Sequence, residues 1–495
     1  MIRKLARFAR AGGGTAVIAM AARVSGQIAM VAVTLVATRQ LTPADFGVFA
    51  IAGALVMLAR TMLYTGPFEY LLKAPAEREG AVAGACLAAN VLVASGWVLL
   101  LGALGLAAPE LFKGGGVAPV ILALAPSVLF AALAAFAESL MLRSGKVRRY
   151  YAITVAVEVG AGLAAMALLL GGWGLWALVA QIYVRLALLV FALGGLGPRL
   201  ALARPRRAEV ADVLRWSASR FGSVLVGFLA NYSGDLVLGV VFSPAASGLY
   251  RASNRMVTAL ADMFVQPAGM LAMTTLAAER ARAGGQAPAC EGGAWLRLAG
   301  LFAVLGWPAL AVLALFAQRI VPLALGPAWS AAGPVVAVFC VARMAGLVTA
   351  VASAALVVGD RQGRVLAVQT AAAIATAGLT IFAAPFGAMG AALAATAVAV
   401  LAAAALGYAA LRREDHAALA EAARLVLIPL AGAFGAAWAA DRLVGRIFIN
   451  SGGLIALALP LACAAVGWLI AAWPVAPALR RAAALLGDTP RAAPL

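Results

Sequence analysis

The sequence predicts an all-α integral membrane protein with about fourteen transmembrane helices, and three observations support this fold class. Of the 495 residues, 65% are hydrophobic and only 12% are charged, and the mean hydropathy is +1.00. A soluble protein carries about a quarter charged residues. Apolar runs of spanning length recur along the chain, and basic residues gather in alternate connectors. No stretch is polar enough for a separate soluble domain.

The predicted spans are apolar segments that meet the length criterion of about 20 residues. Their approximate limits are 15–37, 46–72, 80–107, 117–142, 150–171, 173–196, 214–242, 248–277, 294–317, 333–357, 364–384, 387–411, 423–444 and 453–473. Prolines also fall inside spans, at Pro67, Pro126, Pro267, Pro308, Pro429 and Pro460. We expect neighbouring helices or water to satisfy the carbonyls that these prolines free.

The first span has an alternative interpretation as a signal peptide, because four basic residues precede it (Arg3, Lys4, Arg7 and Arg10). Its spanning length and the interruption by Arg23 favour an uncleaved first helix instead.

The basic residues predict the orientation of the chain. With a cytoplasmic N-terminus, 26 of the 38 Lys and Arg residues fall in cytoplasmic segments, five on the opposite side and seven within spans. Because cytoplasmic loops of membrane proteins are rich in Lys and Arg, we expect both termini in the cytoplasm. The formal net charge of +19 therefore indicates contact with membrane lipid, not with nucleic acid.

An internal repeat predicts two pseudo-symmetric lobes. The segment LTPADFGVFA, residues 41–50, aligns without gaps with FSPAASGLYR, residues 242–251. We expect one six-helix lobe in residues 1–200, a second in 201–412, and two additional helices with a cytoplasmic tail in 413–495. Six helices is an even number, so the lobes should have the same orientation, as in parallel-repeat transporters. Chance similarity between helices rich in Ala and Gly is the alternative.

Charged side chains within spans predict a polar cavity, because each arginine costs roughly 2.5 to 3.5 kcal/mol at the bilayer centre. Helical spacing places Arg251, Arg255 and Asp262 on one face of the eighth span. Arg220, Asn231 and Asp235 share a stripe on the seventh. The seven intramembrane arginines are Arg23, Arg60, Arg185, Arg220, Arg251, Arg255 and Arg343.

The predicted cavity is net cationic. Arg251 and Arg255 have like charge one helical turn apart, which is unfavourable unless an anion or water lies against them. Phosphate or pyrophosphate fits this cavity, since the guanidinium offers a forked donor. Structural alternatives remain: Arg60 and Arg185 could extend to the interface, and Arg343 could form a packing ion pair.

The carboxylates within spans are Glu69, Glu138, Glu158, Asp235 and Asp262. We predict Asp235 and Asp262 as the residues that couple transport to a proton or cation, with a fixed counter-ion role as the alternative. Glu138 is expected near the interface.

Two segments resemble a known family. RQLTPADFGVFAIAGAL, residues 39–55, and FSPAASGLYRASNRM, residues 242–256, are similar to the matching signatures of the polysaccharide transport family. This family comprises the O-antigen and exopolysaccharide flippases of the multidrug/oligosaccharidyl-lipid/polysaccharide exporter superfamily. The resemblance implies twelve helices in two lobes, two further C-terminal helices and a central cationic cavity lined by the first two helices of each lobe.

The resemblance also implies a function. Such flippases move polyprenyl-pyrophosphate-linked oligosaccharides from the cytoplasmic to the periplasmic leaflet of the cell inner membrane, for synthesis of lipopolysaccharide O-antigen, capsule or exopolysaccharide. The resemblance therefore implies a protein of the cell inner membrane. By this resemblance Arg23, Arg220, Arg251 and Arg255 would contact the pyrophosphate, and Asn231 is a further expected substrate contact. The expected partners are the lipid-linked oligosaccharide, membrane lipid and other polysaccharide assembly proteins such as a glycan polymerase.

The expected mechanism is alternating access of the two lobes. A proton or sodium gradient is the expected driving force, because the sequence has no GxxxxGK[ST] motif for ATP. We expect no cofactor, no metal and no enzyme activity, since the four Cys form no CxxC pair and His416 is the single His.

Two alternatives remain. A multidrug antiporter of the same superfamily would favour a net negative cavity for organic cations. A membrane glycan polymerase or ligase would need a large periplasmic loop with catalytic groups, whereas the external connectors here are short and contain no His.

Overall fold

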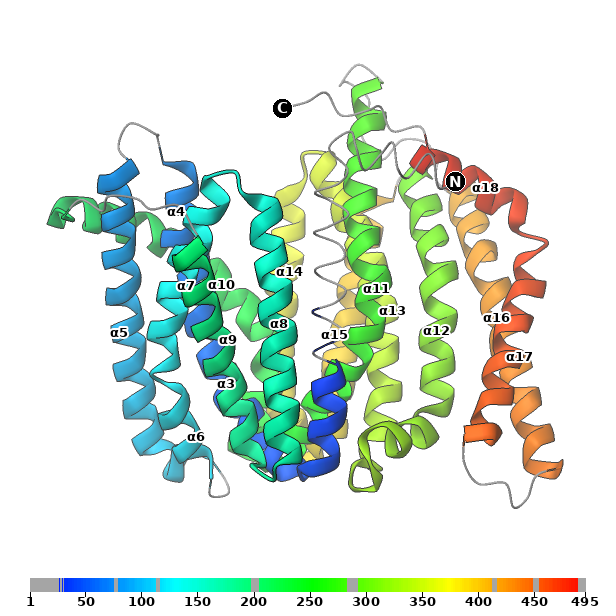
Figure 1. Cartoon of the computed structure of the whole chain (residues 1–495). Helices are drawn as coiled ribbons and strands as arrows, with labels where there is room; N and C mark the ends of the chain where they lie inside the picture. Colours follow the sequence, from blue (N-terminus) through cyan, green and yellow to red (C-terminus); the bar gives the residue numbers. More distant parts are fainter. Residues whose placement is uncertain are drawn as a thin grey trace. The chain divides into compact units, whose positions relative to one another are not determined.

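The computed structural model describes residues 26, 29, 31–74, 79–112, 116–196, 204–282, 293–411, 416–447 and 454–487. These residues are almost entirely helical and include no strand, which confirms the all-α class. Residues 31–40 are helical, and Figure 1 shows the helices that follow. They are α3 (Pro43–Thr65), α4 (Pro67–Lys73), α5 (Glu79–Leu111), α6 (Val117–Leu124), α7 (Ser127–Arg143), α8 (Val147–Leu170), α9 (Leu175–Leu196), α10 (Arg207–Val241), α11 (Pro244–Arg282), α12 (Ala294–Leu325), α13 (Ala332–Val358), α14 (Gln362–Ala383), α15 (Gly387–Ala410), α16 (His416–Ile447), α17 (Leu454–Ala472) and α18 (Ala476–Gly487).

The described helices include eleven segments long and apolar enough to cross a membrane, or twelve if α17 and α18, bent by 81°, form one span. One of the eleven, Gln362–Ala410, contains α14 and α15, which pack against each other. Every expected span from 46–72 onward therefore has a helical counterpart, and the multi-pass membrane fold is confirmed. The first expected span, 15–37, lies largely outside the described residues, as does Arg23.

Two of the prolines expected inside spans break their helices. Pro67 begins α4 directly after α3, and Pro126 separates α6 from α7. A proline lacks the backbone N–H, and its ring clashes with the preceding turn. At the first break Gly66 has non-helical dihedrals, φ −89° and ψ −96°. The two helices still form one candidate span, Pro43–Lys73, across this interruption.

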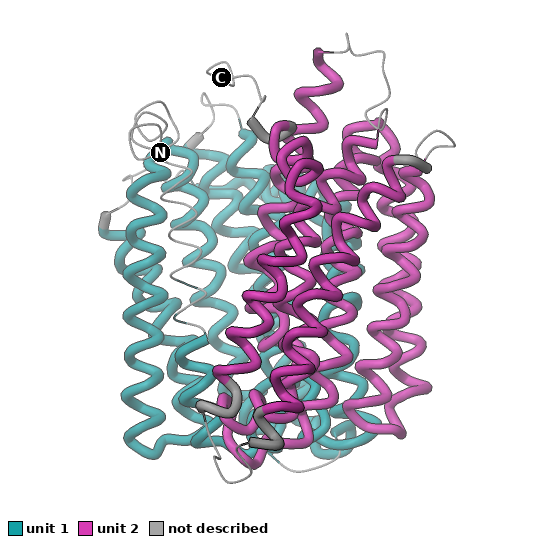
Figure 2. The backbone as a smooth tube through the Cα atoms, turned by 90° about the vertical axis from the view of Figure 1, so that its right-hand side faces the viewer, with its two compact units in different colours: residues 1–251 teal, residues 252–495 magenta. Residues whose placement is uncertain are grey.

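The chain divides into two compact units, coloured separately in Figure 2: unit 1 is residues 1–251 and unit 2 is residues 252–495. This boundary falls later than the expected lobe boundary after residue 200, because α10 packs against α3, α4 and α5 of unit 1. The two units are defined by contacts, whereas the predicted lobes are defined by the sequence repeat. The predicted domains therefore stay residues 1–200, 201–412 and 413–495.

Each unit has its own apolar core. In unit 1, Ile51, Leu63 and Ile121 are fully buried where α3 packs against α6 and α7. In unit 2, Trp295 and Val351 are buried between α12 and α13. Many other large apolar side chains are exposed, such as Phe191, Phe382 and Trp473. A soluble monomer rarely exposes so much apolar surface, whereas lipid accommodates it.

The two repeated sequence segments pack against each other within unit 1. A Cβ atom added to Gly47 of α3 would overlap the carbonyl of Pro244, and one added to Gly248 of α11 would overlap the carbonyl of Pro43. The N-termini of α3 and α11 therefore cross at reciprocal glycines, where the backbones approach more closely than any side chain permits.

The residues before these prolines cap the two helices in the same way. Thr42 accepts a hydrogen bond from the backbone N–H of Asp45, 3.2 Å away, and Ser243 accepts one from Ala246, also at 3.2 Å. A hydroxyl cap, a proline in the first turn and a glycine at the crossing thus account for the repeated Thr/Ser-Pro-x-x-x-Gly pattern.

In unit 2, α16 and α17 form a close pair, side by side in Figure 1. A Cβ on Gly432 would overlap the backbone of Gly467, and the reverse also holds. Ala436 and Ala471 complete a small-xxx-small pattern on each helix, which lets membrane helices approach closely.

The helix α18 packs against α12 and α16. Val475, just before it, is buried in the core of unit 2, and Leu479 packs on the same core. Glu421 of α16 accepts from Arg481 of α18 at 3.1 Å and lies 3.5 Å from Arg297 of α12. Apolar contact and an ion cluster therefore both hold α18 in place.

Asp360, in the connector between α13 and α14, forms an ion pair with Arg280 of α11. We expect this pair to make a contribution to stability that is lost in acid. Arg280 donates to the carboxylate of Asp360 at 2.5 Å, and this hydrogen bond lowers the pKa of Asp360. A carboxyl with a lowered pKa adds stability above its ordinary pKa of about 3.9 and loses it as the pH falls further. Acidification from neutral pH to about pH 3 should therefore lower the Tm of the wild type more than that of Asp360→Asn.

Asn is the matched replacement at this position because it tolerates the φ of 58° found at Asp360. Equal losses of Tm in the two proteins would show that the pair contributes nothing to folding.

Candidate functional site

The described intramembrane arginines of unit 1 lie close to carboxylates of other helices. Of these four arginines, three form salt bridges: Arg185 with Glu158 at 2.6 Å, Arg220 with Glu69 at 2.6 Å, and Arg251 with Asp235 at 2.9 Å. The fourth, Arg60, interacts electrostatically with Glu138 and Glu158. The four arginines thus come with four carboxylates, so the predicted excess of positive charge is balanced within the described spans of unit 1.

The pair of Asp235 and Arg251 is the most buried of the salt bridges. Asp235 of α10 has no exposed surface, and the Arg251 side chain of α11 is 28% exposed. A two-residue turn joins α10 to α11, which brings residues sixteen apart in the sequence together. The Arg251 guanidinium also lies over the Tyr232 ring, 4.6 Å from its centroid, and Tyr232 stacks on Phe228 at 5.1 Å.

One oxygen of this pair has no partner. Oδ2 of Asp235 accepts from Arg251, whereas Oδ1 is buried and makes no hydrogen bond. A buried acceptor without a partner is costly, so this oxygen is a place where a proton or cation could add.

The pair of Arg220 and Glu69 is more open. The Arg220 side chain on α10 is 45% exposed and lies over the Trp216 ring, 5.4 Å from its centroid, while Glu69 is 35% exposed. Glu69 belongs to α4, which packs against α10 and so brings Glu69 to Arg220. A pair with this much water contact exchanges its partner at lower cost than a buried pair.

The remaining predicted site residues lie in other places. Asn231 is exposed and donates to the carbonyl of Gly227 at 2.7 Å. Arg255 and Asp262 are half-buried on the part of α11 that belongs to unit 2. On that helix Asn254 accepts from Arg343 of α13 at 2.8 Å.

The structure therefore brings together Asp235 and Arg251 from the predicted set, and gives Arg220 a carboxylate partner from outside it. The roles of Arg23, Arg220, Arg251, Arg255, Asn231, Asp235 and Asp262 stay predictions.

Three contacts at the site had a detectable signal in the sequence. Tyr232 precedes Asp235 by three residues and Trp216 precedes Arg220 by four, which are the spacings of one helix face. The sequence places the Glu69 carboxylate within a span, but it does not show which arginine Glu69 contacts. The described residues contain no group of three or more His, Cys, Asp or Glu side chains that could hold a metal.

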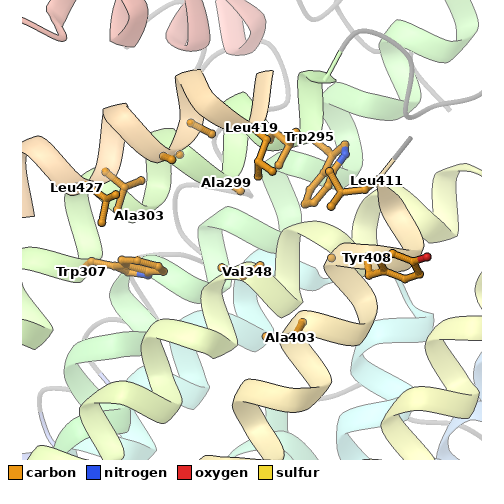
Figure 3. A pocket seen from close by; sticks show the side chains of 17 residues that line it. Trp295, Ala299, Ala303, Trp307, Val348, Ala403, Tyr408, Leu411, Leu419 and Leu427 are labelled. Atoms are coloured by element: carbon orange, nitrogen blue, oxygen red, sulfur yellow. The ribbon is translucent and has the colours of Figure 1, made fainter. Parts of the chain in front are cut away.

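Unit 2 contains an apolar pocket of about 460 Å³ between α12, α13, α15 and α16. Figure 3 shows Trp295 and Trp307 of α12 and Tyr408 of α15 among its lining side chains. The Trp307 indole already donates to the carbonyl of Met344 at 3.1 Å. No charged residue lines the pocket, so it offers no ionic contact to a phosphate.

Comparisons with known proteins place the chain in context. A family model described as "Polysaccharide biosynthesis protein" matches residues 35–334, more than half of the chain. Comparison with curated proteins finds no significant match.

Solved structures share the fold. The protein is similar to the lipid II flippase MurJ in an inward closed conformation, with a TM-score of 0.73 and 11% identity over 94% of this chain and 99% of that one. It is also similar to a multidrug resistance MATE family transporter of the MOP superfamily in an inward-facing conformation, with a TM-score of 0.63 and 14% identity over 80% and 96%. At such identities these similarities establish the fold alone.

Proposed function

Since this chain belongs to the polysaccharide biosynthesis protein family, we propose that it is a flippase for a polyprenyl-pyrophosphate-linked oligosaccharide. It acts in the cell inner membrane, with both termini in the cytoplasm, and delivers the glycan to the periplasmic leaflet. The protein is a transporter, not an enzyme, and works by alternating access. Other assembly proteins, such as a glycan polymerase, then use the delivered glycan.

The observation that carries this proposal is the set of arginine–carboxylate pairs inside the membrane-spanning helices. Arg251 and Arg220 each have a carboxylate partner and an aromatic ring against the guanidinium. A pyrophosphate offers the same kind of acceptor as a carboxylate, with more charge. The substrate therefore replaces the carboxylates at the arginines, and Arg255 adds a further donor one turn along α11.

The same exchange supplies ion coupling. When Arg251 turns to the pyrophosphate, Asp235 is left buried without a cation, and such a charge is unfavourable by several kcal/mol. Protonation of Asp235 removes that charge, so binding of the substrate and uptake of a proton accompany each other. Asp262 is the second coupling candidate.

The test is the double replacement Arg251→Ala with Arg255→Ala. We expect the variant to insert in the membrane but to abolish glycan export, because both forked donors are lost. The measurement is lipid-linked oligosaccharide retained in the inner leaflet of a deletion strain carrying the variant.

Arg215→Ala is the matched control, since Arg215 lies on α10 but pairs with the exposed Asp212 at 3.3 Å. Export at the wild-type level by the double variant would contradict the proposal. Inhibition of wild-type export by organic cations, with no effect of the arginine replacements, would favour a multidrug antiporter instead.

A further inference from the structure

One intramembrane carboxylate of unit 1 differs from the other three. Glu138 of α7 is 7% exposed, and its two oxygens accept hydrogen bonds from two phenols. Tyr64 of α3 donates to Oε1 at 2.5 Å, and Tyr150 of α8 donates to Oε2 at 2.9 Å. Among the described residues no guanidinium or ammonium lies within ion-pair distance of Glu138, whereas Glu69, Glu158 and Asp235 each pair with an arginine.

These neighbours determine the free-energy cost of protonating each carboxylate. Protonation of an ion-paired carboxylate leaves a buried arginine without its counter-ion, which is strongly unfavourable. A phenol, in contrast, can either donate or accept a hydrogen bond. Glu138 can therefore take up a proton without breaking a salt bridge, because its direct hydrogen-bond partners are neutral phenols. Arg60, which interacts electrostatically with Glu138, keeps Glu158 as a second carboxylate nearby.

We propose that Glu138 is a proton-binding site of the transport cycle, held by Tyr64 and Tyr150. This proposal rests on the proposed function and adds to it a second proton-binding residue, distinct from Asp235. A hydronium ion loses its proton to Oε2 of the carboxylate and becomes water. The new O–H donates to the Tyr150 oxygen, and the Tyr150 hydrogen turns away from Glu138. Tyr64 continues to donate to Oε1.

The surroundings are compatible with a site that changes charge. Helices α3, α4, α5, α6, α8 and α9 pack against α7, and α6 contributes no titratable group. The other five helices carry titratable groups. These include Arg60 and Tyr64 of α3, Glu69 of α4, Cys86 of α5, Tyr150 and Glu158 of α8, and Arg185 of α9; α7 itself ends with Arg143. Arg185 is held by Glu158, and the Nε of Arg60 is buried without a hydrogen-bond partner.

The position of Glu138 connects it to the candidate site. Tyr64 lies two residues before the break at Gly66, and α4, which follows, packs against α7 and contains Glu69. Glu69 is the partner of Arg220. A proton on Glu138 therefore weakens the Tyr64 hydrogen bond at the end of α3, because the acceptor loses its charge. This bond lies next to α4, whose Glu69 gives up Arg220 to the substrate in the proposed exchange.

The test is infrared difference spectroscopy of the full-length protein in phospholipid vesicles as the pH is lowered, with no substrate present. We expect a band from the C=O stretch of a buried protonated carboxyl group that titrates in the wild type and is lost in Glu138→Gln. Glu110→Gln, at the exposed end of α5, is the matched control and should retain the band. An unchanged band in Glu138→Gln overturns the proposal.

A second variant guards against misfolding of the first. Tyr150→Phe keeps the carboxyl group but removes one hydrogen-bond partner, so the band should remain and move to higher frequency. A band that stays at the same frequency in this variant overturns the assignment. Because the spectra need no substrate, this test can succeed even if glycan transport fails, and the two proposals fail separately.

Discussion

Replacing Gly47 by Ala should lower the free energy of unfolding by roughly 1–3 kcal/mol or more, because the added Cβ has no space at the crossing of α3 and α11. The atom it would meet is the backbone carbonyl of Pro244, which cannot turn aside as a side chain can. Thermal unfolding of the detergent-solubilised protein, followed by tryptophan fluorescence, measures the effect.

Gly53→Ala provides a control on the same helix. A Cβ at Gly53 meets nothing within 4 Å, so this variant should gain roughly 0.5–1 kcal/mol from the lower flexibility of the unfolded chain. Similar changes at the two glycines would mean that α3 and α11 do not cross as described.

Replacing Asp235 by Ala should cost about 3–5 kcal/mol, because it leaves the Arg251 guanidinium buried without a counter-ion. The double replacement Asp235→Ala with Arg251→Ala should restore much of this loss, since no buried charge then remains. A double-mutant cycle on the unfolding free energy measures the coupling between the two side chains.

The exposed pair of Asp212 and Arg215 on the same helix is the matched comparison. Its cycle should give only about 0–1 kcal/mol, as for other surface ion pairs. If both cycles gave the same small coupling, Asp235 and Arg251 would not form a buried pair in the membrane.

Hydropathy predicted the fold because a bilayer requires long apolar helices whose backbone is satisfied internally. Most span limits agree with the helices to within a few residues, but α10 and α16 each begin seven residues before the predicted span. Pro67 lies inside one span, Pro43–Lys73, as predicted, although the helix is interrupted after Thr65. A proline pattern alone does not distinguish a kink from a break, because neighbouring helices decide whether the freed carbonyls find partners.

The family was also predictable. The two segments that resemble polysaccharide flippases contain the capped, proline-initiated helix starts and the crossing glycines. Their similarity thus reflects a packing requirement as well as descent. The match of the family model to residues 35–334 confirms this prediction.

The site is harder to predict, because helical spacing relates charged residues within one helix and does not show which helices lie together. The sequence predicts Arg220 and Arg251 as donors to a ligand, although Glu69 and Asp235 also lie within spans. The pairing of Asp235 with Arg251 follows from the short turn between α10 and α11, and could have been predicted from that hairpin. The pairing of Arg220 with Glu69 could not, since it depends on the packing of α4 against α10, which are far apart in the sequence.

The placement of α18 has a consequence for biosynthesis. Val475 and Leu479 close the core to which α12 and α13 contribute, more than a hundred residues earlier in the chain. The translocon must therefore release those earlier helices into the bilayer with part of this surface uncovered, and the surface stays accessible to lipids and chaperones until the ribosome has made α18.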